Sequence, residues 1–128
     1  MSTSWPLEGT TPLIADRFIE TYIAAVSLQT IGLFVELTAD NTVNVTTGPN
    51  SKKVVGVTLT KALAGQKISV VSRGKVRVVP YATLTYGDQV CATSGGTALT
   101  DNSSLNTTIL GICSQGGNSA GTAIVELW

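Results

Sequence analysis

The stretch Ile68-Ser-Val-Val-Ser-Arg-Gly-Lys-Val-Arg-Val78 decides the fold class. Apolar residues alternate with polar ones on both sides of its central Arg-Gly pair, and a period of two is typical of a strand with one buried face. The segment 72–75 has turn composition, so the stretch predicts a β-hairpin. Its basic residues alternate with its valines. This predicts a basic stripe, made of Arg73, Lys75 and Arg77, on the outward face of the hairpin.

The sequence on both sides repeats this pattern of short apolar strands and turns. Alternation at 33–37 and at 43–45, around a Thr-Ala-Asp-Asn turn, predicts another hairpin. Further strands are expected at 54–59, 89–92, 98–99, 109–113 and 122–128. About ten strands with breaks every 8 to 12 residues predict an all-β chain, folded as a single small β-barrel or sandwich of short antiparallel strands.

The sequence of residues 17–27 is compatible with a helix and with a strand. Phe18, Tyr22 and Val26 recur at helical spacing, and Asp16 stands where a helix N-cap would be. The β-branched and aromatic content of the same segment favours a strand. The pattern alone leaves both alternatives open.

Residues 1–16 predict an extended N-terminal arm, followed by a β domain at 17–128. The arm contains two prolines, several polar residues and an isolated tryptophan, which do not suit a regular element. An aromatic side chain on an arm can anchor an interface. Trp5, Leu7 and Leu13 are therefore candidate contact residues for a partner, and folding of Trp5 onto its own domain is the alternative.

The charge is balanced overall but uneven along the chain. Eight Lys and Arg oppose eight Asp and Glu in 128 residues, and only 12% of residues are charged. Seven of the eight cations fall within residues 41–87, which contain no acid. This segment suits an acidic surface on another copy or on another protein, unless folding intersperses the charges. Nucleic acid is not expected as a partner, because the net charge is zero and no aromatic residues interleave with the cations.

Several kinds of chemistry are excluded by composition. The absence of His removes the commonest general base and zinc ligand. Cys91 and Cys113 fit no short metal or redox motif and are expected in the core, with a pairing between them left open. Asp88 is expected to cap a turn. We therefore expect no enzyme activity, no cofactor and no metal. No apolar run approaches the ~18 residues of a membrane span, so no membrane partner is expected.

The order of the motifs resembles that of a known family. The motifs are Val54-Val-Gly-Val57, Ala64-Gly-Gln66, Arg73-Gly-Lys-Val76, Tyr86-Gly-Asp-Gln-Val90, Ile109-Leu-Gly-Ile112 and Thr122-Ala-Ile-Val-Glu-Leu127. In this order they resemble the small capsid decoration (cement, head-stabilising) proteins of tailed bacteriophages, over about residues 18–128.

The resemblance implies a non-enzymatic β domain that forms a homotrimer. Such a protein is made in the host cytoplasm and sits in the virion on the exterior of the capsid, where it binds the major capsid protein and stabilises the head. The N-terminal arm would reach onto the capsid surface. The resemblance also favours a strand over a helix for residues 17–25.

A head-fibre or tail-associated module that binds a receptor or glycan is the alternative function. Such a module stacks exposed aromatic side chains on sugar rings. The chain has few aromatic residues, and most are expected in the core or on the arm. This composition favours decoration.

Overall fold

The computed structural model describes residues 18–100 and 108–128, and within these ranges the chain forms nine strands. They are β1 (Phe18–Ala24), β2 (Phe34–Ala39), β3 (Thr42–Val45), β4 (Val54–Thr58), β5 (Lys67–Val78), β6 (Gln89–Ala92), β7 (Ala98–Thr100), β8 (Gly111–Gln115) and β9 (Ala123–Leu127). The predicted arm, residues 1–16, lies outside the described residues.

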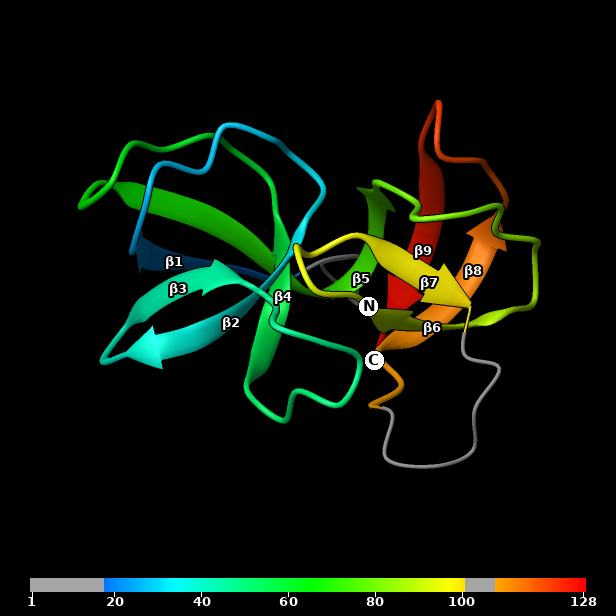
Figure 1. The fold of residues 1–128 in the computed structure, drawn as a ribbon, viewed down its shortest axis with the longest axis horizontal. Helices are drawn as coiled ribbons and strands as arrows, with labels where there is room; N and C mark the ends of the chain where they lie inside the picture. The colour runs from blue at the N-terminus through cyan, green and yellow to red at the C-terminus, as the bar shows by residue number, and fades with distance from the viewer. Residues whose placement is uncertain (1–17, 101–107) are drawn as a thin grey trace, which may run out of the picture.

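The first five strands close into a barrel. The strand order is β1-β3-β2-β4-β5-β9-β8-β6-β7, and β1 also pairs with β5, which completes the ring. Figure 1 shows this barrel beside a second sheet, which consists of the C-terminal half of β5 and strands β6 to β9. The all-β prediction is confirmed. One pairing is parallel, because β1 meets β3 with Ile23 opposite Thr42, and the other strand pairings are antiparallel.

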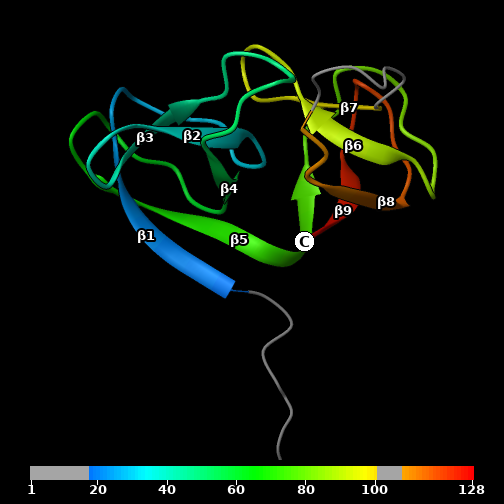
Figure 2. The ribbon, with the colours of Figure 1, turned by 90° about the horizontal axis from the view of Figure 1, so that it is seen from below.

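The predicted hairpin at 68–78 is wrong. β5 is one continuous strand whose first half pairs with β1 and β4 and whose second half, from Gly74 onward, pairs with β9. Gly74 has a φ of 101°, a conformation that glycine adopts without strain. The strand bends sharply in this region (Figure 2). Apolar and polar residues alternate in the two halves of β5 as they do in hairpin strands, but the halves pair with other strands and not with each other.

The other predicted hairpin is confirmed. β2 and β3 pair antiparallel, with Val35 opposite Val45, around a turn in which Asn41 has a φ of 52°. Asparagine tolerates this left-handed conformation better than most residues. Residues 18–24 form a strand rather than a helix, as the family resemblance implies.

The molecule has two hydrophobic cores. The barrel core contains Ala24, Leu28, Val35, Val43, Ala62, Ile68 and Val70. The second core fills the space between the barrel and the second sheet, and its buried residues are Phe34, Val57, Val71, Val76, Val78, Leu84, Val90, Ala92, Ala98, Cys113, Ala123, Val125 and Leu127.

The wall between the two cores is buried on both faces. Phe34 and Val35 are neighbours on β2 and both are fully buried, yet they belong to different cores. Val70 and Val71 repeat the arrangement on β5. Successive side chains of a strand point to opposite faces, so these strands read as short continuous apolar runs.

Candidate interaction surfaces

The structure exposes all three residues of the predicted basic stripe, but it splits them into two groups. Arg73 precedes the bend of β5, and its guanidinium lies 5.8 Å from the ring centroid of Phe18 on β1. Lys75 and Arg77 follow the bend and face away from the second core. The stripe is therefore one cation beside β1 and a pair of cations on the second sheet.

The two paired cations have different neighbours, an acidic residue beside Lys75 and a neutral one beside Arg77. Lys75 lies opposite Glu126 in the β5–β9 ladder, and residues directly opposite share a face of the sheet. The Arg77 guanidinium donates a hydrogen bond to the hydroxyl of Thr122 at 3.3 Å. Arg77 is thus held in place on the surface while its charge stays accessible.

Two adjoining hollows flank Arg77. One, of about 240 Å³, is lined by Ile31, Thr58, Leu59, Val76 and Arg77. The other, of about 200 Å³, is lined by Lys75, Val76, Arg77 and Ile124. Aliphatic walls beside cationic side chains suit a partner segment that combines an apolar side chain with a carboxylate.

The expectation that most aromatic residues are in the core or on the arm is wrong. Among the described aromatic residues only Phe34 is fully buried. The exposed ones are Phe18 at 48%, Tyr81 at 62%, Tyr86 at 78% and Trp128 at 61%. The exposure of Trp128 follows from the pattern of β9. Buried and outward positions alternate along this strand, and the residue after it falls on the outward side.

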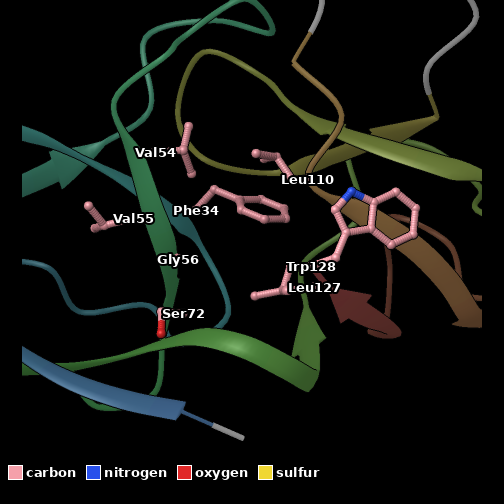
Figure 3. Close-up of a pocket in the computed structure, with 8 residues that line it drawn as sticks. All are labelled: Phe34, Val54, Val55, Gly56, Ser72, Leu110, Leu127 and Trp128. Atoms are coloured by element: carbon pink, nitrogen blue, oxygen red, sulfur yellow. The ribbon is translucent and has the colours of Figure 1, made fainter.

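Trp128 stands beside a pocket of about 60 Å³ whose lining side chains are mostly aliphatic or aromatic, and we call it the Trp128 pocket. The pocket lies between the barrel and the second sheet, and Figure 3 shows its lining side chains. They are Phe34, Val54, Val55, Ser72, Leu110, Leu127 and Trp128, with Gly56. The lining residues of the pocket come from five separate segments of the chain, so no single sequence motif predicts the pocket.

Asp88 has the role expected for it. Its carboxylate accepts hydrogen bonds from the backbone N–H of Thr85 at 2.8 Å and from the hydroxyl of Thr100 at 3.1 Å. The residue therefore caps the turn before β6. In the described part of the chain, no group of three or more His, Cys, Asp or Glu could hold a metal ion, and no helix is long and apolar enough to cross a membrane.

Both cysteines are buried, as predicted. Cys113 is a free thiol on the inner face of the second sheet, so it does not pair with Cys91. Burial raises the pKa of the Cys113 thiol; the backbone hydrogen bond at Gln115 opposes this rise, and the charge of Asp88 adds to it. The thiol is therefore protonated at neutral pH and is a poor nucleophile.

The three arm candidates, Trp5, Leu7 and Leu13, lie outside the described residues. The chain enters the described structure at Phe18, at the start of β1. The described structure therefore begins next to the bend of β5, because Phe18 lies opposite Arg73.

No protein-family model matches the sequence, and no curated protein matches it. The fold, however, has a solved counterpart. It is similar to the N base of the head fibre gp8.5 of bacteriophage phi29. The superposition has a TM-score of 0.63 and 14% sequence identity, and it covers 88% of this chain and 94% of the fibre base.

The likeness spans nearly the whole of both chains, so it includes the barrel and the second sheet together. At this identity it shows a shared fold and not a shared set of contact residues. The sequence motifs resemble those of decoration proteins, whereas the solved counterpart in fold is part of a head fibre.

Proposed function

We propose that this chain is a structural protein of a phage head, located on the outside of the capsid, where it binds the major capsid protein and acts as a decoration protein. The observation that carries the proposal is the fold shared with the base of a phage head fibre over 88% of the chain. The ordered motifs of decoration proteins support the same location. The role requires no catalytic group and no cofactor.

The surface of the described structure suits a role in binding. A decoration protein stabilises the shell by burying surface across the joints between capsid subunits. Exposed apolar and aromatic side chains are the usual anchors of such interfaces. Phe18, Ile19 and Trp128 are exposed near the attachment point of the arm, and Lys75 and Arg77 offer cations on the second sheet.

The arm provides the second part of the proposed capsid contact. Trp5 and Leu7 combine a large aromatic side chain with an aliphatic one, and an extended segment can add a strand to the edge of a neighbouring sheet. The β domain then forms the homotrimer that the family resemblance implies. Head binding and trimer formation are in this way assigned to different parts of the chain.

The test is a binding assay with purified shells that lack this protein. The full chain should co-sediment with the shells, and a chain lacking residues 2–12 should not, although its oligomeric state by light scattering stays that of the full chain. A full chain that never binds shells would overturn the proposal. A shortened chain that binds as well as the full one would overturn the role of the arm.

The second candidate function is to form the base of a head fibre. The similarity in fold to the solved base of a head fibre favours this candidate. The exposed Tyr81 and Tyr86 offer rings that could stack on sugars if the module also binds a glycan. In that case Tyr86→Ala should lower binding to host-cell glycans and leave attachment to shells unchanged. Equal glycan binding by the variant would speak against a glycan site on this loop.

A further inference from the structure

The Trp128 pocket is an apolar hollow with an exposed indole at its rim. Barrel strands β2 and β4 provide Phe34 and Val54, and the other side consists of Leu110, Leu127 and Trp128 (Figure 3). Its volume of about 60 Å³ is several times the ~10–15 Å³ that one water needs. The hollow therefore has room for a branched aliphatic side chain, and the aliphatic and aromatic side chains among its lining residues offer that occupant apolar contacts.

The N-terminal arm is attached at the edge of this pocket. Ser72 lines the pocket, and its hydroxyl donates a hydrogen bond of 3.3 Å to the backbone carbonyl of Phe18. The strand register explains this contact. Phe18 lies opposite Arg73 and Ile19 opposite Val71, so Ser72 is the extra residue of a bulge and can turn its side chain toward Phe18.

The arm carries aliphatic side chains within reach of the pocket. Ile14 and Leu13 precede Phe18 by four and five residues, and an extended chain spans ~3.3–3.6 Å per residue. The pair can therefore reach about 13 to 18 Å from Phe18, while the pocket begins at Ser72, the direct neighbour of Phe18. Trp5 carries a bulky indole at the far end of the arm, so it fits this small hollow less well.

We propose that the aliphatic pair Leu13–Ile14 of the same chain docks in the Trp128 pocket and covers the indole. The same chain is the occupant because the connecting segment is short, so closing this loop loses little entropy. On this proposal Leu13 and Ile14 contact their own β domain. Leu13 is thereby separated from Trp5 and Leu7 as a capsid contact.

Trp128 itself reports on the pocket, because the chain has only two tryptophans. The Trp5→Phe variant leaves Trp128 as the single tryptophan, and acrylamide quenching of its fluorescence measures exposure. We compare this chain with two further versions, which lack residues 2–12 or residues 2–16. Quenching should be the same for the first two. It should rise about twofold when residues 2–16 are removed, with a red-shifted emission, because the indole then loses its proposed cover.

Point variants decide the matter if the shorter chain does not fold. In the Trp5→Phe background, Leu13→Asp with Ile14→Asp should raise quenching as the longer deletion does, because a carboxylate is unfavourable in an apolar hollow. Leu7→Asp is the matched control and should leave quenching unchanged. Equal quenching in the double variant and its parent would overturn the proposal.

A mixing experiment tests whether the occupant is the same chain. The chain lacking residues 2–16, in which Trp128 is the single tryptophan, is mixed with an excess of full-length chain that carries Trp5→Phe and Trp128→Phe. Quenching should stay high in the mixture. Restored protection would assign the pocket to the arm of a second copy and overturn the same-chain proposal. Shell binding is measured separately, so a failure of the capsid role leaves this result intact.

Discussion

The barrel and the second sheet share strand β5 but bury their apolar residues differently. The barrel closes on itself, and its core consists only of residues from 24 to 70. The second sheet is open, and its core also takes Phe34, Val57 and Val71 from the wall of the barrel. A closed barrel removes its own edges, whereas an open sheet must be covered by another layer.

This difference implies that the second sheet depends on the barrel for its burial, whereas the barrel does not depend on the second sheet to the same extent. The barrel has a complete core of its own, while the second sheet buries its inner face only because the barrel is beside it. The shared wall of β2, β4 and β5 is therefore the part of the molecule on which both regions rely. The interaction surfaces lie along the same junction, since the Trp128 pocket and the hollow beside Ile31 each take residues from both regions.

The largest effect is expected at Gly56, in the middle of this wall. A Cβ there would lie 2.1 Å from the carbonyl oxygen of Val71 and 2.8 Å from a Val70 methyl, with a φ of 154°. Gly56→Ala must force β4 away from β5, so we expect a loss of more than about 4 kcal/mol or no folding.

Gly121→Ala is the matched control, because nothing lies within 4 Å of its Cβ position. Its free energy of unfolding should stay within about 0.5 kcal/mol of the parent. Urea denaturation measures both variants. A Gly56→Ala protein as stable as the control would show that the wall is not tightly packed there.

Two neighbours on β2 separate the contributions of the two cores. Phe34→Ala empties the second core and should cost about 3–5 kcal/mol, whereas Val35→Ala empties the barrel core and should cost about 2 kcal/mol. Native-state hydrogen exchange should show faster opening of β6 to β9 in the first variant and of the barrel strands in the second. Identical exchange patterns would contradict the distinction between the two cores.

A smaller effect is expected from pH, through Cys113 in the second core. Burial raises the pKa of this thiol above that of the unfolded chain. Its contribution to stability is complete below the unfolded pKa of about 8.5 and is lost as the pH rises through the folded pKa. Cys113→Ala should therefore show a weaker decline of stability above pH 8.5 than the parent. An equal decline in both proteins would place the titrating group elsewhere.

Much of the fold could be predicted from the sequence because a period of two marks strands well. The hairpin of β2 and β3 and the strand 89–92 follow from alternation and turn residues alone. Alternation does not say which strand pairs with which. Both halves of β5 look like hairpin partners, and only the tertiary structure shows that they join different sheets.

The interaction surfaces were less accessible to sequence analysis. Outward positions such as Lys75 and Arg77 follow from alternation. The Trp128 pocket does not, because Phe34, Leu110 and Trp128 come together only when the second sheet packs on the barrel. The prolines at 6 and 12 predict an arm that lies outside the described residues. The proposed docking of this segment relies on the bulge at Ser72, which leaves no mark in the sequence.

The smallest effect on stability is expected on the surface, where the two regions can be compared by charge reversal. Arg77→Glu on the second sheet and Lys61→Glu at the exposed end of the barrel should each change stability by less than about 0.5 kcal/mol. Only Arg77→Glu should slow association with shells, with the largest difference at low salt. Equal slowing by both variants would indicate a general charge effect rather than a contact at Arg77.

The central claim, a decoration protein on a phage head, is tested most directly by counting copies. Quantitative mass spectrometry of purified virions gives the ratio of this chain to the major capsid protein. The account predicts a ratio near one chain per capsid subunit. A few copies per particle would contradict decoration and favour the base of a fibre, and absence from the particle would contradict a virion role altogether.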